Sequence, residues 1–197
     1  METRTDRVRI APVRPAPQKA GWIEVICGSM FAGKTLELIR RLRLATIARQ
    51  PVQAFKSGLD TRYRVNYIVS HDKSKIRSVP VRRAEQILTH VQPNTEVVGI
   101  DEAHFFGPAL VKVCERLADE GRRVIVAGLE QDFRGKPFMT LAKLMAVAEY
   151  VTKNLAICVV CAAPANRNQR ISGGRRRIDV GHSDKYEARC RRCFSRA

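Results

Sequence analysis

The chain has 197 residues, with 36 Lys and Arg against 19 Asp and Glu, which gives a formal net charge of +17. Hydrophobic residues make up 45% of it, an ordinary share for a globular protein and too large a share for a disordered one. No apolar run reaches about 18 residues, which excludes a transmembrane helix, and no apolar segment is typical of a signal peptide. We therefore expect a cytoplasmic protein, with its six cysteines as thiols or metal ligands rather than disulfides.

The positive charge raises the question of a nucleic-acid partner. Basic residues are spread over the N-terminal arm, the segment 40–43 and the C-terminal part, and no aromatic residues are interleaved with them to stack on bases. A positive field also serves an enzyme that acts on anionic phosphates, and a solvated basic surface is common. We do not expect a nucleic-acid partner, although a nucleic-acid-stimulated ATPase stays open as an alternative.

Apolar periodicity predicts alternating strands and helices after an N-terminal arm. Residues 1–20 carry charge and proline without periodicity, so we expect a disordered basic arm. Strands are expected at 22–27, 52–56, 76–81, 96–101, 123–127 and 150–157. Helices are expected at 34–48, 83–90, 108–120 and 137–148, and a loop at 57–71. The alternation predicts an α/β fold with a mainly parallel sheet flanked by helices.

A glycine-containing motif follows the first expected strand and opens the first expected helix. Its residues, which fit G-x-x-x-x-G-K-[ST] throughout, are Gly28, Ser29, Met30, Phe31, Ala32, Gly33, Lys34 and Thr35. In such a loop, successive backbone N–H groups and the helix dipole bind phosphate. We expect Lys34 to reach the β- and γ-phosphates of ATP and the Thr35 hydroxyl to coordinate Mg²⁺. The motif predicts a nucleotide site like that of the P-loop NTPases. The alternative is a glycine-rich turn between strand and helix that binds no ligand.

Two carboxylates end the expected strand at 96–101. Ligand sites in parallel sheets gather at the carboxyl ends of strands, so Asp101 is placed to hold Mg²⁺, usually through water. Glu102 is the candidate general base, able to deprotonate a hydroxyl that attacks the γ-phosphate. The alternative is an acidic pair that merely ends a strand. His104 is either a neighbour of the ligand or a packing histidine.

The six cysteines divide into two kinds. Cys158 and Cys161 form one C-x-x-C pair, and Cys190 and Cys193 form another. Four thiolates in this spacing suit a closed tetrahedral Zn²⁺ site with a structural role, although a redox pair or idle cysteines are alternatives. The remaining two, Cys27 and Cys114, lie in apolar patterns and are expected in the core.

Several separated motifs, in the same order along residues 21 to about 194, resemble the type II thymidine kinases. They are the P-loop, Asp60-Thr61-Arg62-Tyr63, Ser70-His71-Asp72, Asp101-Glu102-Ala103-His104-Phe105-Phe106, Gly128-Leu129-Glu130-Gln131-Asp132-Phe133, and Gly181 through Asp184-Lys185-Tyr186 to Cys190 and Cys193. The resemblance implies transfer of the ATP γ-phosphoryl group to the 5′-hydroxyl of thymidine, and of deoxyuridine. It further implies a homotetramer and feedback inhibition by thymidine triphosphate. A binding module that only senses nucleotide is a further alternative.

The resemblance also implies site residues and a division of the chain. The nucleotide side of the site includes Asp60, Thr61, Arg62, Ala103 and His104. The thymidine side includes Met30, Phe105, Leu129, Phe133, Arg177, Ile178, Asp179, Val180, Gly181 and Tyr186. Residues 21–153 would form the kinase domain, and residues 154–197 a zinc-bearing lasso and C-terminal tail that folds over the nucleoside. The chain departs from the family at His104, where Gln is usual, and at Glu130, where Asp is usual.

Overall fold

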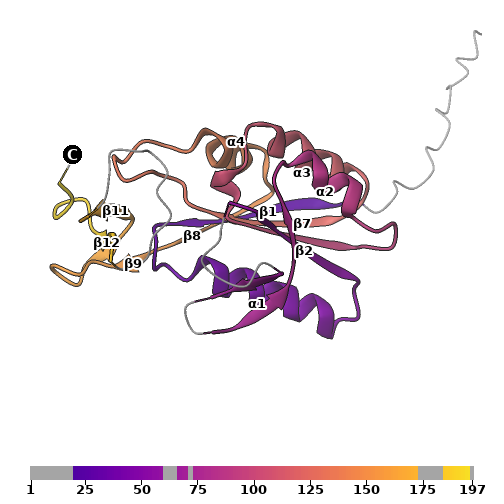
Figure 1. The fold of residues 1–197 in the computed structure, drawn as a ribbon, viewed down its shortest axis with the longest axis horizontal. Helices are drawn as coiled ribbons and strands as arrows, with labels where there is room; N and C mark the ends of the chain where they lie inside the picture. The colour runs from indigo at the N-terminus through magenta and orange to yellow at the C-terminus, as the bar shows by residue number, and fades with distance from the viewer. Residues whose placement is uncertain (1–19, 60–65, 71–72, 173–183, 196–197) are drawn as a thin grey trace, which may run out of the picture.

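The computed structural model describes residues 20–59, 66–70, 73–172 and 184–195. A six-stranded sheet, in the order β5-β2-β6-β7-β1-β8, crosses the centre of the molecule (Figure 1). Its strands are β1 (Trp22–Gly28), β2 (Val52–Ser57), β5 (Val79–Val81), β6 (Val97–Asp101), β7 (Arg123–Gly128) and β8 (Tyr150–Asn154). Every neighbouring pair in this sheet is parallel, which confirms the predicted fold class.

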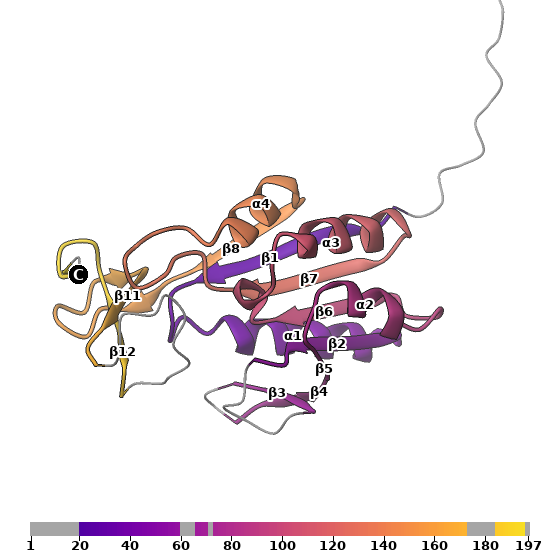
Figure 2. The same cartoon turned by 45° about the horizontal axis from the view of Figure 1, so that its top comes forward.

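Helices cover the sheet on both faces, as Figure 2 shows. One face is packed by α1 (Lys34–Ile47), whose buried side chains recur at helical spacing: Leu38, Ile39, Leu42 and Ala45. The other carries α2 (Glu85–His90), α3 (Ala109–Asp119) and α4 (Met139–Val147). Alternate residues of each strand face the two helical layers, so one apolar cluster forms on each face. None of the helices that the structure describes has the length and apolar character needed to cross a membrane.

The close approach of α1 to the sheet depends on one glycine. Gly99 lies in the middle of β6, and a Cβ added there would come within 2.5 Å of Leu42 Cδ1. The Leu42 side chain therefore fills the space that any other residue at this position would take. This packing brings α1, and the loop before it, close to β6.

The middle of the chain differs from the sequence prediction. The expected loop at 57–71 contains a strand, β3 (Tyr67–Val69), which pairs with β4 (Lys75–Arg77) in an antiparallel hairpin. The prediction of a single strand at 76–81 was wrong, because this range contains parts of two strands. Of these, β4 belongs to the hairpin and β5 joins the main sheet beside β2. Ile68 is 2% exposed in the cluster under α1, so burial of this side chain anchors the hairpin.

The last expected strand, at 150–157, also divides. Its first part is β8, and its second part is β9 (Ala156–Ile157), which pairs with β10 (Pro164–Ala165) away from the main sheet. Two further strands, β11 (Arg167–Arg170) and β12 (Tyr186–Arg189), form another antiparallel pair. We call residues 155–172 and 184–195 the C-terminal module. Its core consists mainly of three alanines and two cysteines: Ala156, Ala165, Ala188, Cys158 and Cys190.

Parallel pairing gives the molecule its candidate site. The carboxyl ends of β1, β6 and β7 lie along one edge of the sheet, with β7 between the other two. Gly28, Asp101 and Gly128 are the last residues of these strands. The C-terminal module begins just after β8 ends at the same edge. Residues from both parts of the chain therefore meet there.

Candidate active site

The phosphate-loop motif adopts a tight turn between β1 and α1. Phe31 and Gly33 have positive φ angles of 64° and 73°, and Gly33 caps the helix. A Cβ at Gly28 would lie 2.4 Å from the carbonyl oxygen of Asn154, so only glycine allows the loop to pass the end of β8. The N-terminus of α1 therefore opens from this loop, in the arrangement that binds phosphate in other proteins.

Two polar side chains stand where the phosphate loop meets α1, and that of Thr35 reaches the end of β6. Lys34 Nζ donates to the carbonyl oxygen of Ser29 at 2.7 Å, which folds the lysine over its own loop. Thr35 Oγ1 lies 3.5 Å from Asp101 Oδ1, across the end of β7. A hydroxyl and a carboxylate at this separation fit the oxygen ligands that Mg²⁺ prefers, with water completing its shell. The sequence analysis assigned both residues to Mg²⁺, and the fold brings the two side chains together.

Glu102 follows Asp101 in a strained backbone conformation. Its φ and ψ angles are 54° and 40°, in the left-handed region that costs a non-glycine residue about 1–2 kcal/mol. Its N–H donates to Asp101 Oδ1 at 2.9 Å, and its carbonyl accepts from the N–H of Phe105 at 3.0 Å. Strain of this kind persists where the surroundings over-determine it, and it often marks a functional position.

His104 lies directly beside that carboxylate. Its Nε2 is 3.5 Å from Glu102 Oε2, and its Nδ1 is 3.3 Å from the N–H of Leu129. The Leu129 N–H can only donate, so Nδ1 accepts and the proton of the neutral ring sits on Nε2, facing Glu102. The rings of Phe105 and Phe138 pack at 4.2 and 5.1 Å from the imidazole. The structure thus places His104 in the site, next to the candidate base.

The expected nucleoside residues divide between the sheet edge and the C-terminal module. Met30, Phe105 and Leu129 are partly buried along the edge, and Phe133 is 7% exposed on the loop after β7. Tyr186 opens β12 and is 6% exposed. Two expected segments, 60–62 and 177–181, lie outside the described residues. The described residues of the predicted nucleoside site therefore lie on the sheet edge, on the loop after β7 and on β12.

Three residues at this site were missed by the sequence analysis. The guanidinium carbon of Arg170 lies 3.7 Å from the centroid of the Phe133 ring and 5.2 Å from that of Tyr186. Lys56 is 2% exposed on β2, paired in register with Asp101. Asn168 hydrogen-bonds the phosphate loop itself. No local pattern reveals these residues, because each reaches the site through pairing between distant segments.

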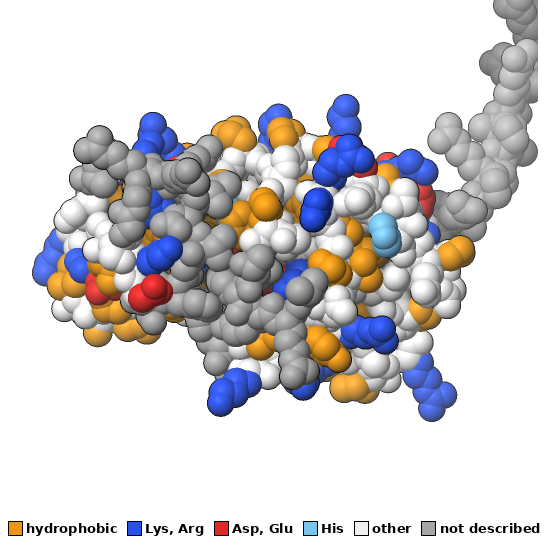
Figure 3. Space-filling model, in the orientation of Figure 1, with side chains coloured by type: hydrophobic (Ala, Val, Ile, Leu, Met, Phe, Trp, Pro, Cys, Tyr) orange, Lys and Arg blue, Asp and Glu red, His pale blue; other side chains and the backbone are white. Residues whose placement is uncertain are grey.

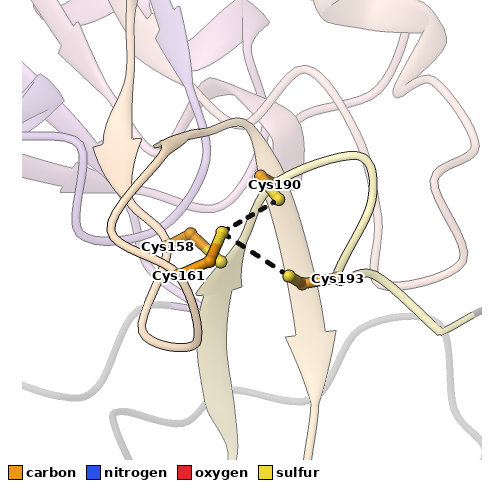
Figure 4. Close-up of side chains that lie close together, drawn as sticks. All are labelled: Cys158, Cys161, Cys190 and Cys193. Atoms are coloured by element: carbon orange, nitrogen blue, oxygen red, sulfur yellow. Dashed lines mark hydrogen bonds between the residues drawn. The ribbon is translucent and has the colours of Figure 1, made fainter.

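The four paired cysteines converge at one point of the C-terminal module (Figure 4). All four sulfur atoms lie within 4.8 Å of one another, and Cys161 Sγ is 3.6 Å from the sulfurs of both Cys190 and Cys193. A tetrahedral zinc site with Zn–S bonds of about 2.3 Å requires sulfurs about 3.8 Å apart. The donor set and its spacing therefore fit Zn²⁺.

Local hydrogen bonds favour the thiolate form at two of these cysteines, Cys158 and Cys190, whereas hydrogen bonds with the sulfurs of Cys161 and Cys190 raise the pKa of Cys193 to about 12. Burial alone would raise the pKa of the Cys158 thiol, but N–H groups of Cys190, Val160 and Cys161 lower it to about 6. The N–H of Cys193 lowers the pKa of Cys190 in the same way. Metal ligands must be deprotonated, and N–H groups directed at sulfur stabilise that form.

The other two cysteines behave differently. Cys27 and Cys114 are fully buried, and burial raises the pKa of each thiol. They are core residues, as predicted. Near Cys27, the carboxylate of Glu130 lies 3.3 Å from Lys153 Nζ. On the outer surface, Figure 3 shows Lys and Arg side chains scattered over one face rather than joined in a stripe.

Comparison with known proteins identifies the family. A family model described as thymidine kinase matches residues 21–194. The chain belongs to the thymidine kinase family. The family that the sequence motifs indicated is therefore confirmed, and the match spans both the sheet and the C-terminal module.

Two relatives in this family are similar over most of the chain. A thymidine kinase of Rhodothermus sp. (strain ITI 518) is 59% identical over 174 residues, which cover 88% of this chain and 81% of the relative. A thymidine kinase of Bdellovibrio bacteriovorus (strain ATCC 15356 / DSM 50701 / NCIMB 9529 / HD100) is 56% identical over 174 residues, 88% of this chain and 85% of that one. Among solved structures, the flagellar accessory protein FlaH of Methanocaldococcus jannaschii covers 79% of this chain and 74% of its own, at 12% identity and a TM-score of 0.47.

Proposed function

We propose that this chain transfers the γ-phosphoryl group of ATP to the 5′-hydroxyl of thymidine, and of deoxyuridine, giving the nucleoside monophosphate. The observation that carries the proposal is the meeting of the phosphate loop with Asp101 and Glu102 at one sheet edge, in a member of the thymidine kinase family. The loop supplies a phosphate site, and Glu102 supplies a carboxylate beyond it. This is the pair of functions that phosphoryl transfer to an alcohol requires.

Binding of ATP would draw on the loop and the helix behind it. The backbone N–H groups of the motif Gly28–Thr35 and the N-terminus of α1 attract the phosphates. Lys34 would exchange its hydrogen bond to the Ser29 carbonyl for the β- and γ-phosphates. Thr35 and, through water, Asp101 would hold Mg²⁺, which would supply positive charge against the phosphates. Asp60, Thr61, Arg62, Ala103 and His104 complete the proposed nucleotide side.

Glu102 would then act as the general base. Its carboxylate accepts the proton of the 5′-hydroxyl as that oxygen forms a bond to the γ-phosphorus, and the bond from phosphorus to the β-phosphate oxygen breaks to release ADP. The strained backbone and the contact with His104 support this role, because they fix where the carboxylate lies. A lasso folded over the nucleoside would exclude water from the transfer and so limit hydrolysis of ATP.

The nucleoside base would enter between the sheet edge and the C-terminal module. Met30, Phe105, Leu129 and Phe133 would surround the thymine ring, and Tyr186 would approach it from the module. An apolar slot with a few polar groups suits a planar base. The Arg170 guanidinium now covers Phe133, so base stacking on that ring requires Arg170 to shift. Backbone groups of residues 177–181 would recognise the edges of the base.

The larger organisation follows the family resemblance. We place a kinase domain at residues 21–153 and a zinc-bearing lasso domain at 154–197, with Zn²⁺ held by the four paired cysteines. We also propose a homotetramer, inhibition by thymidine triphosphate and a cytoplasmic location. Apolar side chains that stay exposed support further assembly, among them Ile47 on α1 and Tyr150 on the edge strand β8.

A panel of nucleosides tests the proposal. Each nucleoside is supplied with ATP and Mg²⁺, and formation of ADP is followed; we expect ADP formation with thymidine and deoxyuridine. DNA and RNA are added in parallel, because stimulation by either without thymidine would favour a nucleic-acid-dependent ATPase instead. Glu102→Gln should lower kcat at least about 100-fold while ATP still binds. Unchanged turnover of that variant would remove Glu102 from the role of base.

A further inference from the structure

Asn168 joins the C-terminal module to the phosphate loop. It lies on β11 and is 3% exposed. Its Oδ1 accepts from the N–H of Met30 at 2.7 Å, and its Nδ2 donates to the carbonyl of Gln131 at 2.9 Å. A backbone N–H can only donate and a carbonyl can only accept, so both halves of the amide are matched and its orientation is fixed.

The two backbone segments that Asn168 holds belong to different parts of the proposed site. Met30 lies inside the phosphate loop, and Gln131 lies on the loop that carries Leu129 and Phe133. A second contact runs the same way, since Ser29 Oγ donates to the carbonyl of Ala165 at 3.3 Å. The first half of the phosphate loop is therefore held from outside the sheet, by β10 and β11.

The position of Asn168 depends in turn on the cysteine cluster. In the β11–β12 pair, Asn168 stands opposite Ala188, and Cys190 directly follows that strand. On the other side, β11 follows β10, whose partner β9 leads straight into Cys158. Because the module has a core of small side chains, the link between its two cysteine pairs fixes where β11 lies.

We infer that Asn168 is a positioning residue that couples the four-cysteine site to ATP binding. With a metal in that site, β11 is held, and Asn168 keeps Met30 and Gln131 in the arrangement that receives the triphosphate. Without the metal, or without the Asn168 amide, the loop keeps its sequence and loses its outer support. The inference rests on the proposed function only in taking this loop as the ATP site.

Asn168→Ala tests the positioning, with Gln169→Ala as a matched control. Gln169 is the next residue on the same strand, and its Oε1 accepts from the N–H of Ser195, far from the loop. We expect Asn168→Ala to raise the dissociation constant for ATP about tenfold, about 1.4 kcal/mol, near the upper limit for one neutral hydrogen bond. The dissociation constant of Gln169→Ala for ATP should stay within about twofold of the wild-type value. Bound zinc per chain should be unchanged in both.

Metal removal tests the coupling. A chelator selective for Zn²⁺, with Mg²⁺ in excess, should weaken ATP binding about tenfold in the wild type and less than about threefold in Asn168→Ala, since coupled changes are not additive. Three outcomes would each overturn the inference. Zinc removal could weaken ATP binding by Asn168→Ala as much as it weakens binding by the wild type. Alternatively, Asn168→Ala could bind ATP as tightly as the wild type, or it could lose its zinc. A wild type that binds ATP and leaves thymidine unchanged would instead refute the proposed function.

Discussion

The sheet and the C-terminal module are stabilised by different physical means. The sheet buries large aliphatic side chains on both faces, including Ile26, Leu38, Ile100 and Leu117, each completely shielded from solvent. The module has a core of alanines and cysteines and four sulfurs in one place. Burial of each large aliphatic side chain contributes about 1.5–3 kcal/mol to the free energy of unfolding. The buried cluster of the module contains no such side chain among its described residues. The sheet is therefore stable through packing, whereas the module combines a small core with a set of four thiols that fits Zn²⁺.

The difference has a consequence for the proposed site. The less stable part supplies Tyr186, Arg170 and Asn168, and it supports the phosphate loop of the more stable part. Elements of low local stability are those that can move during binding. In a site built across both parts, motion of the module to admit a nucleoside would also act on the phosphate loop that it supports.

Metal removal should produce the largest effect and separate the two parts. Structural zinc binding is worth about 10–16 kcal/mol, so Cys158→Ala should lose zinc and unfold β9 to β12. Amide hydrogen exchange should show fast exchange in the module, while β1, β6 and β7 stay protected. Cys114→Ala is the control, since Cys114 is buried under the sheet and should keep the zinc content unchanged. Loss of protection in both parts together would contradict the comparison.

A buried ion-pair network should give the next largest effect, on the sheet alone. Glu24 is 6% exposed on β1, and its carboxylate bonds Arg123 at 2.6 Å and Arg41 at 2.7 Å. Breaking a buried pair leaves an uncompensated charge, so Glu24→Gln should reduce the free energy of unfolding by about 3 kcal/mol. Chemical denaturation, followed by a signal from the sheet, measures this loss of stability. Glu120→Gln is the control, because that carboxylate is 39% exposed beside Arg116 and should matter little.

The same network predicts how stability responds to acid. Burial alone would raise the pKa of Glu24, but hydrogen bonds from Arg123, Trp22 and Arg41 lower it below 4.5. The hydrogen bond from Arg40 and then that from Arg41 lower the pKa of Glu37 to about 2. A lowered folded-state pKa gives stability that is complete above the ordinary pKa near 4.5 and is lost as pH falls toward about 2. Glu24→Gln should lose less stability than the wild type across that range.

A methyl group placed between α1 and β6 should have a smaller effect. Gly99→Ala sets a Cβ 2.5 Å from Leu42 Cδ1, and such overpacking costs about 1–3 kcal/mol. The midpoint temperature of thermal unfolding should fall accordingly, and the zinc content should not change. Gly107→Ala is the control, since nothing lies within 4 Å of a Cβ there. Equal stability of the two variants would show that packing at this contact is looser than the structure has it.

Sequence patterns predicted the features that are local and missed those that depend on pairing. The phosphate loop, the acidic end of β6 and the cysteine pairs are short motifs whose residues are neighbours in the chain. The hairpin of β3 and β4 was missed because its strands are three residues each, too short for periodicity to register. Arg170 and Lys56 were missed because their places come from strand register.

The smallest effect concerns His104, and it tests how the sheet edge prepares its base. The ring accepts from the N–H of Leu129 and directs its Nε2 proton toward Glu102. A glutamine offers the same pair of groups, an accepting oxygen and a donating nitrogen, whereas leucine offers neither. His104→Gln should therefore keep kcat within about threefold of the wild type, and His104→Leu should lower it about tenfold, or about 1.4 kcal/mol.

That split distinguishes positioning from packing. Loss of the ring removes its contacts with Phe105 and Phe138 in both variants, so a role in packing alone would lower their stability and kcat together. A role in orienting Glu102 lowers kcat only where the hydrogen-bonding groups are lost. Steady-state kinetics with thermal unfolding on the same samples measures both. If His104→Leu turns over as fast as the wild type, the Glu102 carboxylate is held by its strained backbone and by Asp101 without help from the imidazole.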